Sequence, residues 1–148
     1  MANVLYGLKD THNLSLKNII QHTQSVRKGI KKSLLVVDMP KGSYQNKKIA
    51  KKNAKLIMDI TKCDAVKIES NNNNYVIINE LVKSNIPVMG HIGYTPQFKK
   101  KFQVEGNTKL KALKLLNEAN LIEAAGAFSI VLECISPQTS KLITQRLK

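Results

Sequence analysis

Short apolar runs alternate with longer amphipathic segments along most of the chain. Runs with the length and composition of buried β-strands occupy residues 34–37, 65–68, 87–90 and 129–132. Segments with apolar residues at helical spacing occupy residues 15–28, 46–62, 75–83, 108–125 and 137–148. A regular alternation of strands and helices is typical of an α/β fold in which each helix connects two parallel strands. Residues 1–14 carry no strong pattern of either kind.

Polar and glycine residues at the segment boundaries predict where several helices begin and end. Ser15 is expected to cap the first helix, and Gly29 to take the left-handed position after it. The asparagines of 71–74 are expected to form a turn that caps the helix beginning at Tyr75. Gly126 is expected to stop the helix of 108–125. The inward face of that helix is predicted to consist of Leu110, Leu113, Leu116, Ala119, Leu121 and Ala124.

Ionisable residues stand at the carboxyl end of every predicted strand. They are Asp38, the pair Lys67 and Glu69, His91 and Glu133. Each one alone has an ordinary structural explanation, since an aspartate after a strand usually forms a turn or a cap. Crossover connections of one hand place the carboxyl ends of parallel strands on the same side of a sheet. We therefore expect these side chains to converge on one site.

The length of the chain limits the size of the fold. With 148 residues it has the size of one domain, and we assign residues 1–148 to a single unit. A closed (β/α)8 barrel needs about 250 residues. The prediction is therefore a partial (β/α)8 TIM barrel of about four parallel βα units. The sequence shows no long apolar stretch and no signal-peptide pattern at its beginning, so we expect a cytoplasmic protein without a membrane segment.

The chain is strongly basic, with 24 Lys and Arg against 10 Asp and Glu and a net charge of +14. Such a charge makes nucleic acid the first alternative partner to consider. Arg27 and Arg146 are the only arginines, and aromatic residues make up 5% of the chain. Readers of base edges rely on arginine, and single-strand binders rely on stacking rings. The composition therefore favours solvated lysine-rich helix faces over a nucleic-acid site.

Four motifs resemble one enzyme family in their order and spacing. They are VVDMPKGSY at 36–44, AVKIES at 65–70, PVMGHIGYTPQ at 87–97 and VLECI at 131–135. Together they resemble the 3-methyl-2-oxobutanoate hydroxymethyltransferase (ketopantoate hydroxymethyltransferase) family. The resemblance extends over nearly the whole chain from Gly7 onward.

This resemblance implies a Mg-dependent (β/α)8 barrel that transfers a hydroxymethyl group from 5,10-methylenetetrahydrofolate to 3-methyl-2-oxobutanoate. The product is 2-dehydropantoate, a precursor of pantothenate. Carried over motif by motif, Asp38 and Glu69 resemble the metal-side acids, and Asp38, Lys67 and His91 the substrate-binding residues. Glu133 resembles the proton acceptor. Enolate chemistry agrees with these roles, because a hard cation held by carboxylates and a fixed ammonium group both stabilise a negative oxygen.

The sequence also departs from the pattern of the family. Lys41 stands where an apolar residue is usual, and Ser70 and Asn71 replace a Gly-Gly pair. A Gly-Asp-Ser motif that supplies another metal aspartate and a Gly-rich closing segment are both absent. We therefore expect a member truncated at both ends, completed by self-association or by a second chain. An inactive remnant of the enzyme and a basic nucleic-acid-binding module remain as alternatives.

Overall fold

The computed structural model describes residues 2–7, 9, 14–71 and 74–148, with the side chains of residues 2 and 3 left aside. Its centre is a parallel sheet in the order β1-β2-β3-β4. The strands are β1 (Val36–Asp38), β2 (Ala65–Glu69), β3 (Val88–Gly93) and β4 (Ser129–Glu133). Strand β3 runs three residues beyond the predicted end at 90, so His91 lies inside the strand and not after it.

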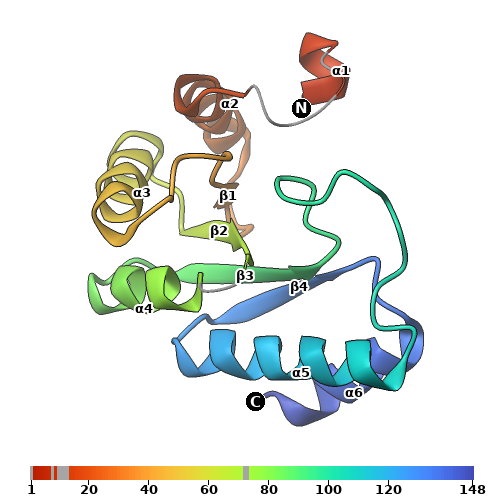
Figure 1. The fold of residues 1–148 in the computed structure, drawn as a ribbon. Coiled ribbons are helices and arrows are strands. Elements are labelled where there is room, and N and C mark those ends of the chain that lie inside the picture. The colour runs from red at the N-terminus through yellow and green to blue at the C-terminus, as the bar shows by residue number, and fades with distance from the viewer. Residues whose placement is uncertain (1, 8, 10–13, 72–73) are drawn as a thin grey trace.

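Helices connect the strands and cover one face of the sheet. They are α1 (Ala2–Tyr6), α2 (Leu16–Gly29), α3 (Lys47–Thr61), α4 (Tyr75–Lys83), α5 (Lys109–Ala124) and α6 (Pro137–Arg146). Helices α2 to α6 form an arc around the sheet, which leaves the opposite face towards the long loop between β3 and α5 (Figure 1). Sequential strand order with all crossovers on one face is the arrangement of a partial (β/α) barrel. Helix α1 lies in the segment for which no element was predicted.

Side-chain caps explain the starts of three helices, α2, α3 and α5. The side chains of Ser15, Asn46 and Thr108 each accept a hydrogen bond from the backbone N–H three residues later. Two boundary predictions were wrong. Gly29 is the last residue of α2, and Ile30, with extended backbone, follows it. Of the predicted turn at 71–74, the hydrogen bond from Asn74 N–H to the carbonyl oxygen of Asn71 is present, whereas Asn72 and Asn73 lie outside the described residues. The predicted side-chain cap by Asn74 is absent, because its backbone is helical, and its amide donates to the carbonyl oxygen of Glu69.

The core lies between the outer face of the sheet and the helices. Val66, Ile68 and Ile92 on the strands are fully buried against this layer. Gly90 allows α5 to approach closely, because a Cβ atom there would lie 2.5 Å from Cγ2 of Ile122. The predicted inward face of α5 was largely wrong. Leu115, Ala119 and Ile122 are the buried residues of α5, whereas Leu110, Leu113 and Leu121 are exposed.

The inner face of the sheet carries the predicted polar residues. In the register of the sheet Asp38 pairs with Lys67, Glu69 with His91, and Gly93 with Glu133. In the part of the chain that the structure describes, β1 and β4 each pair along one edge only.

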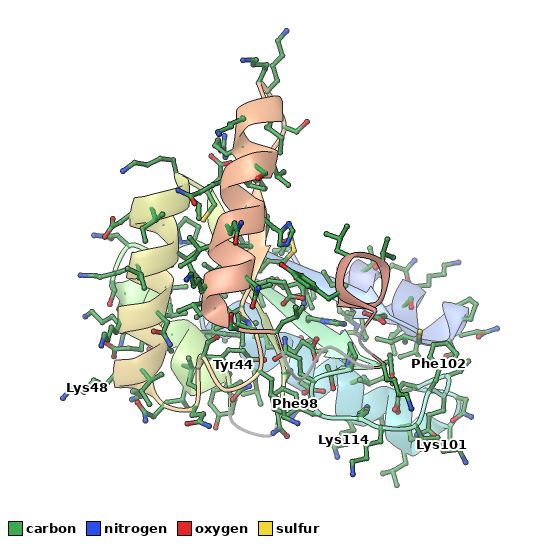
Figure 2. The ribbon with its side chains drawn as sticks, turned by 90° about the horizontal axis from the view of Figure 1, so that it is seen from above. Tyr44, Lys48, Phe98, Lys101, Phe102 and Lys114 are labelled. Atoms are coloured by element: carbon green, nitrogen blue, oxygen red, sulfur yellow. The ribbon has the colours of Figure 1, made fainter. Side chains whose placement is uncertain are left out.

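Lysines such as Lys48 and Lys101 project away from the body of the molecule (Figure 2). Among the described helices, none combines the length and apolar character required to cross a bilayer.

Candidate active site

The ends of the four strands bring all five predicted site residues together. Lys67 stands at the centre of this strand-end cluster, which also contains Asp38, Glu69, His91 and Glu133. The Lys67 Nζ atom lies 2.8 Å from Oδ1 of Asp38 and 3.2 Å from Nδ1 of His91. On the other side of the imidazole, Nε2 of His91 lies 3.1 Å from Oε2 of Glu133. The predicted convergence is therefore present in the structure.

The imidazole of His91 is buried, with 2% of the side chain exposed. Burial lowers its pKa to about 4, and the positive charge of Lys67 contributes to the same shift. His91 is therefore neutral at pH 7. Because the ammonium group of Lys67 faces Nδ1 as a donor, the ring proton belongs on Nε2, towards Glu133. In this tautomer the protonated Nε2 atom lies close to the Glu133 carboxylate, but the two groups are not aligned as a hydrogen bond.

Glu69 is also buried, at 2% exposed, but it has fixed partners. Its Oε2 atom accepts a hydrogen bond of 2.9 Å from the backbone N–H of Gln97. Burial raises its pKa to about 7, and the negative charges of Asp38 and Glu133 add to this rise. The Gln97 N–H and the charge of Lys67 act in the opposite direction. Glu69 therefore titrates close to neutral pH, and a cation placed beside it would favour its ionised form.

Asp38 lies at the open edge of the cluster, and half of its side chain is exposed. Loss of hydration around the carboxyl group raises its pKa, and the ion pair with Lys67 offsets part of this rise. Glu133 is likewise accessible, with 39% of its side chain exposed. The two acids at the outer strands can therefore meet a small molecule that approaches from solvent.

The donor set of the cluster suits a hard cation with several water ligands. No group of three or more His, Cys, Asp or Glu side chains within the described residues is arranged to hold a metal ion. Asp38 and Glu69 supply two carboxylates from adjacent strands. Magnesium is commonly bound by one or two carboxylates and retains water, whereas structural zinc needs four protein ligands. The residues present fit hydrated magnesium.

The low pKa of His91 makes a prediction about stability. An unfolded chain binds a proton at its histidines near pH 6.5, whereas folded His91 does so only near pH 4. Stability from this group is therefore complete above pH 6.5 and is lost as the pH falls towards 4. Urea unfolding of the His91→Gln variant should lack this loss, which amounts to roughly 2 kcal/mol between pH 7 and 4.5. Parallel pH profiles for the variant and the original chain would contradict the assignment.

A buried hydrogen-bond network around Gln97 was not predicted from the sequence. Its side chain contacts Tyr44 and the carbonyl oxygen of Met39, and its backbone contacts Glu69. Gln97 belongs to the PVMGHIGYTPQ motif, but nothing in the order of residues shows that this loop folds back onto β1 and β2. The one feature that marks Gln97 is that it is a buried polar residue, and its burial is known only once the fold is known.

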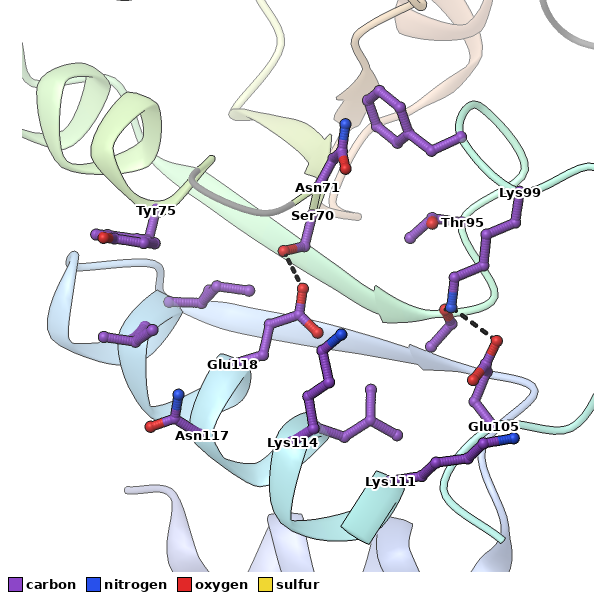
Figure 3. A pocket seen from close by; sticks show the side chains of 15 residues that line it. Ser70, Asn71, Tyr75, Thr95, Lys99, Glu105, Lys111, Lys114, Asn117 and Glu118 are labelled. Atoms are coloured by element: carbon purple, nitrogen blue, oxygen red, sulfur yellow. Dashed lines mark hydrogen bonds and ion pairs between the residues drawn. The ribbon is translucent and has the colours of Figure 1, made fainter. Parts of the chain in front are cut away.

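A pocket of about 450 Å³ lies beside the strand-end cluster, between α4, α5 and the ends of β2 and β3 (Figure 3). The rings of Tyr75 and Phe98 and the side chains of Lys111 and Lys114 are part of its lining. None of the strand-end residues lines it, but Gly93, which is paired with Glu133 in the sheet, does. The pocket therefore adjoins the cluster along β3.

Two of the departures from the family pattern can be located. Ser70 lines this pocket and donates a hydrogen bond to Glu118 on α5. Lys41 is exposed. Neither side chain makes a recorded contact with the members of the strand-end cluster, so the structure gives no sign that these residues crowd it.

Comparison with known proteins identifies the family. The sequence model described as ketopantoate hydroxymethyltransferase matches residues 1–148. The chain belongs to the ketopantoate hydroxymethyltransferase family. It is 45% identical over 148 residues to the 3-methyl-2-oxobutanoate hydroxymethyltransferase of Pelagibacter ubique (strain HTCC1062), covering 100% of the chain and 58% of that relative. It is 40% identical over 151 residues to the enzyme of the same name from Pseudothermotoga lettingae, covering 99% of the chain and 57% of that relative.

The chain spans somewhat more than half the length of these two ketopantoate hydroxymethyltransferases. Among solved structures, 2,3-dimethylmalate lyase, a PEP mutase/isocitrate lyase superfamily member, matches with a TM-score of 0.71 at 14% sequence identity. The match covers 97% of the chain and 52% of that structure. This similarity concerns the fold alone and agrees with the partial barrel.

Proposed function

We propose that this chain provides the catalytic strand ends of a 3-methyl-2-oxobutanoate hydroxymethyltransferase. In the reaction a one-carbon unit passes from 5,10-methylenetetrahydrofolate to 3-methyl-2-oxobutanoate and gives 2-dehydropantoate, with water as the source of the hydroxyl oxygen. The observation that carries the proposal is the contact chain Asp38–Lys67–His91–Glu133. It supports the proposal because a carboxylate, a neutral imidazole and an ammonium group lie together at one accessible mouth, within a chain that belongs to the family.

Each residue of the cluster has a distinct role in this proposal. Glu133 removes the proton from C3 of the keto acid, and the electron pair of the C–H bond moves into an enolate. The ammonium group of Lys67 binds the carboxylate or the enolate oxygen. The imidazole of His91 lies against the Glu133 carboxylate, 3.1 Å away at its nearest atom, and limits where that carboxylate can move. Water adds to the methylene carbon as one of its two C–N bonds breaks, and the proton released from the water passes to the freed nitrogen. C3 of the enolate then forms a bond to this carbon as the second C–N bond breaks, and the proton held by Glu133 passes to the second nitrogen, which leaves tetrahydrofolate.

Asp38 and Glu69 are the proposed ligands of magnesium. When bound, Mg²⁺ supplies electrostatic stabilisation of the negative charge that develops on the keto oxygen. Ionised Glu69 is required for this role, and the raised pKa of the unliganded group makes metal binding weaker as the pH falls below about 7.

The pocket beside the cluster is the proposed place for the folate cosubstrate. Its volume lies within the usual range of small-molecule sites. Tyr75 and Phe98 provide aromatic surface for a planar group, and Lys111 and Lys114 provide positive charge for carboxylates. The position of Gly93 between this pocket and Glu133 keeps the two substrates adjacent.

Further strands are proposed to complete the barrel, supplied by a second copy or by another polypeptide. The unpaired edges of β1 and β4 in the described residues offer parallel strands a place to add. The chain matches 58% of the Pelagibacter relative, and the proposed further strands correspond to part of the remainder of that relative. We also propose a cytoplasmic location, where the substrates of this pathway would be encountered.

Proton exchange tests the proposed function without requiring the folate. In D2O with Mg²⁺, the protein should replace the C3 proton of 3-methyl-2-oxobutanoate by deuterium. This converts the methyl doublet into a singlet in the proton NMR spectrum. Chelation of the metal should return the rate to that measured without protein, because the enolate loses its main electrostatic stabilisation. Exchange no faster than in the protein-free sample would contradict the proposal and favour an inactive remnant.

A further inference from the structure

Gln97 is held from three directions at the point where the loop after β3 crosses the strand ends. Its side-chain Nε2 donates to the carbonyl oxygen of Met39 at 2.9 Å, and its Oε1 accepts from the hydroxyl of Tyr44 at 2.6 Å. Its backbone N–H donates to Oε2 of Glu69 at 2.9 Å. Gln97 is 4% exposed and Tyr44 is 3% exposed. The loop is therefore attached to the segment after β1 and to the end of β2 by buried hydrogen bonds.

The two side-chain partners fix the orientation of the Gln97 amide. The Met39 carbonyl oxygen can only accept, so it requires the NH2 group of the amide. Tyr44 donates to the amide oxygen, and burial, together with the negative charge of Glu69, raises the pKa of Tyr44 and keeps its hydroxyl protonated. The opposite orientation of the amide would place its oxygen against the Met39 carbonyl oxygen, and neither of these two acceptors can donate. The side chain of Gln97 thus has one favourable placement.

We propose that Gln97 is a positioning residue for Glu69, with Tyr44 as its anchor. The side-chain hydrogen bonds hold the backbone of Gln97, and that backbone presents the N–H group that fixes one oxygen of Glu69. The other oxygen, Oε1, is left facing the cluster, 3.9 Å from Nδ1 of His91. This inference rests on the proposed function, because it assigns Glu69 a cation to bind. Contacts that orient a metal ligand in this way typically change metal affinity by about 10–100-fold.

A purely structural role of Gln97 would be to hold the loop in place. The same loop has a second buried attachment at its far end, where the hydroxyl of Thr139 on α6 donates to the carbonyl oxygen of Gly106 at 2.8 Å. Thr139 is 3% exposed and has no recorded contact with the strand-end cluster. Thr139→Val removes one of two side-chain hydrogen bonds to this oxygen at nearly constant volume, and Ser136 Oγ donates the other at 2.9 Å. It is therefore the matched control, because it loosens the loop without touching the partners of Glu69.

The experiment measures Mn²⁺ binding to the full chain by electron paramagnetic resonance, with Mn²⁺ as a spectroscopic substitute for Mg²⁺. The variants are Gln97→Leu, Tyr44→Phe, Thr139→Val and Glu69→Gln. We expect Gln97→Leu to weaken binding by about tenfold and Tyr44→Phe to weaken it by a smaller factor. Thr139→Val should bind as the original chain does. Equal affinities of Gln97→Leu and Thr139→Val would overturn the positioning role, whether both are normal or both are weakened.

A metal-free readout separates this inference from the proposed function. If Glu69→Gln binds Mn²⁺ as well as the original chain, the assignment of the metal ligand fails. The contact itself is then tested by the ¹⁵N–¹H resonance of the Gln97 backbone amide. Positioning requires this resonance to move in Glu69→Gln and in Tyr44→Phe but not in Thr139→Val. Tyr44→Phe removes a single oxygen, so it replaces Gln97→Leu as the test variant if Gln97→Leu does not fold. A Gln97 amide resonance that does not move in Tyr44→Phe refutes the inference.

Discussion

Replacing Glu133 by Gln should reduce C3 proton exchange of 3-methyl-2-oxobutanoate by about 10²–10⁴-fold, the usual contribution of a positioned general base. Glutamine keeps the shape of the side chain but cannot accept the proton. Nε2 of His91 lies 3.1 Å from Oε2 of Glu133 without a hydrogen bond between them, so the substitution removes no hydrogen bond there and the local structure should persist. Exchange rates followed by proton NMR at saturating substrate measure the effect. Unchanged thermal unfolding would show that the loss is chemical.

The matched control for this variant is Glu80→Gln. Glu80 is a glutamate on α4 that forms a surface ion pair of 3.5 Å with Lys51, remote from the strand ends. Its removal changes the net charge by the same amount and leaves the proposed base in place. Exchange should stay within about twofold of the original rate, because exposed ion pairs contribute little to stability. A similar loss in both variants would mean that charge, and not the identity of the base, controls the rate.

The strand ends could be predicted because their signal is local. A β-favouring run followed by an ionisable residue describes each strand, and the one-sided crossovers of a parallel sheet bring such residues together. Asp38, Lys67, Glu69, His91 and Glu133 accordingly lie in one cluster. Their roles with metal and substrate remain predictions.

The buried face of helix α5 could not be predicted from its own sequence. Residues 109–124 contain five leucines and one isoleucine, spread so that more than one face of the helix is apolar. The face that becomes buried is chosen by the close approach of Ile122 to Gly90, a contact between residues far apart in the chain. The exposed Leu110 and Leu113 belong to the face left over. The apolar periodicity of α5 therefore allows more than one buried face, and tertiary packing determines which of them is buried.

The attachments of the loop that contains Gln97 could not be predicted from the sequence either. The loop after β3 contains glycine, proline and three successive lysines, and this composition does not indicate where the loop attaches. In the structure it is attached at both ends, through Gln97 to β1 and β2 and through Gly106 to α6. The middle is held as well, because Nζ of Lys99 donates to the Gly93 carbonyl oxygen and to Glu105. Long-range hydrogen bonds of this type have no signature in the order of residues.

Gly93 connects the fold to the site at the point where β3 and β4 end. Its φ angle is +95°, in the region that favours glycine. A Cβ atom at this position would lie 2.1 Å from the carbonyl oxygen of Glu133 and 2.7 Å from Cγ1 of Ile135. The next residue, Tyr94, donates its backbone N–H to that same Glu133 oxygen at 2.8 Å. The absence of a side chain at Gly93 therefore allows the backbone of the proposed base to be held against β3.

Gly93→Ala should therefore lower the free energy of unfolding by about 3 kcal/mol or more, as a strained backbone and a backbone clash combine. Urea unfolding measures this loss. Any folded variant should also exchange the C3 proton more slowly, because relief of the clash displaces Glu133.

Gly29→Ala is the control. Gly29 is the last residue of α2, and a Cβ atom added there would meet nothing within 4 Å. Alanine at this position should stabilise the protein by about 0.5–1 kcal/mol. If both alanines were equally tolerated, close packing at Gly93 could not be what fixes the position of Glu133.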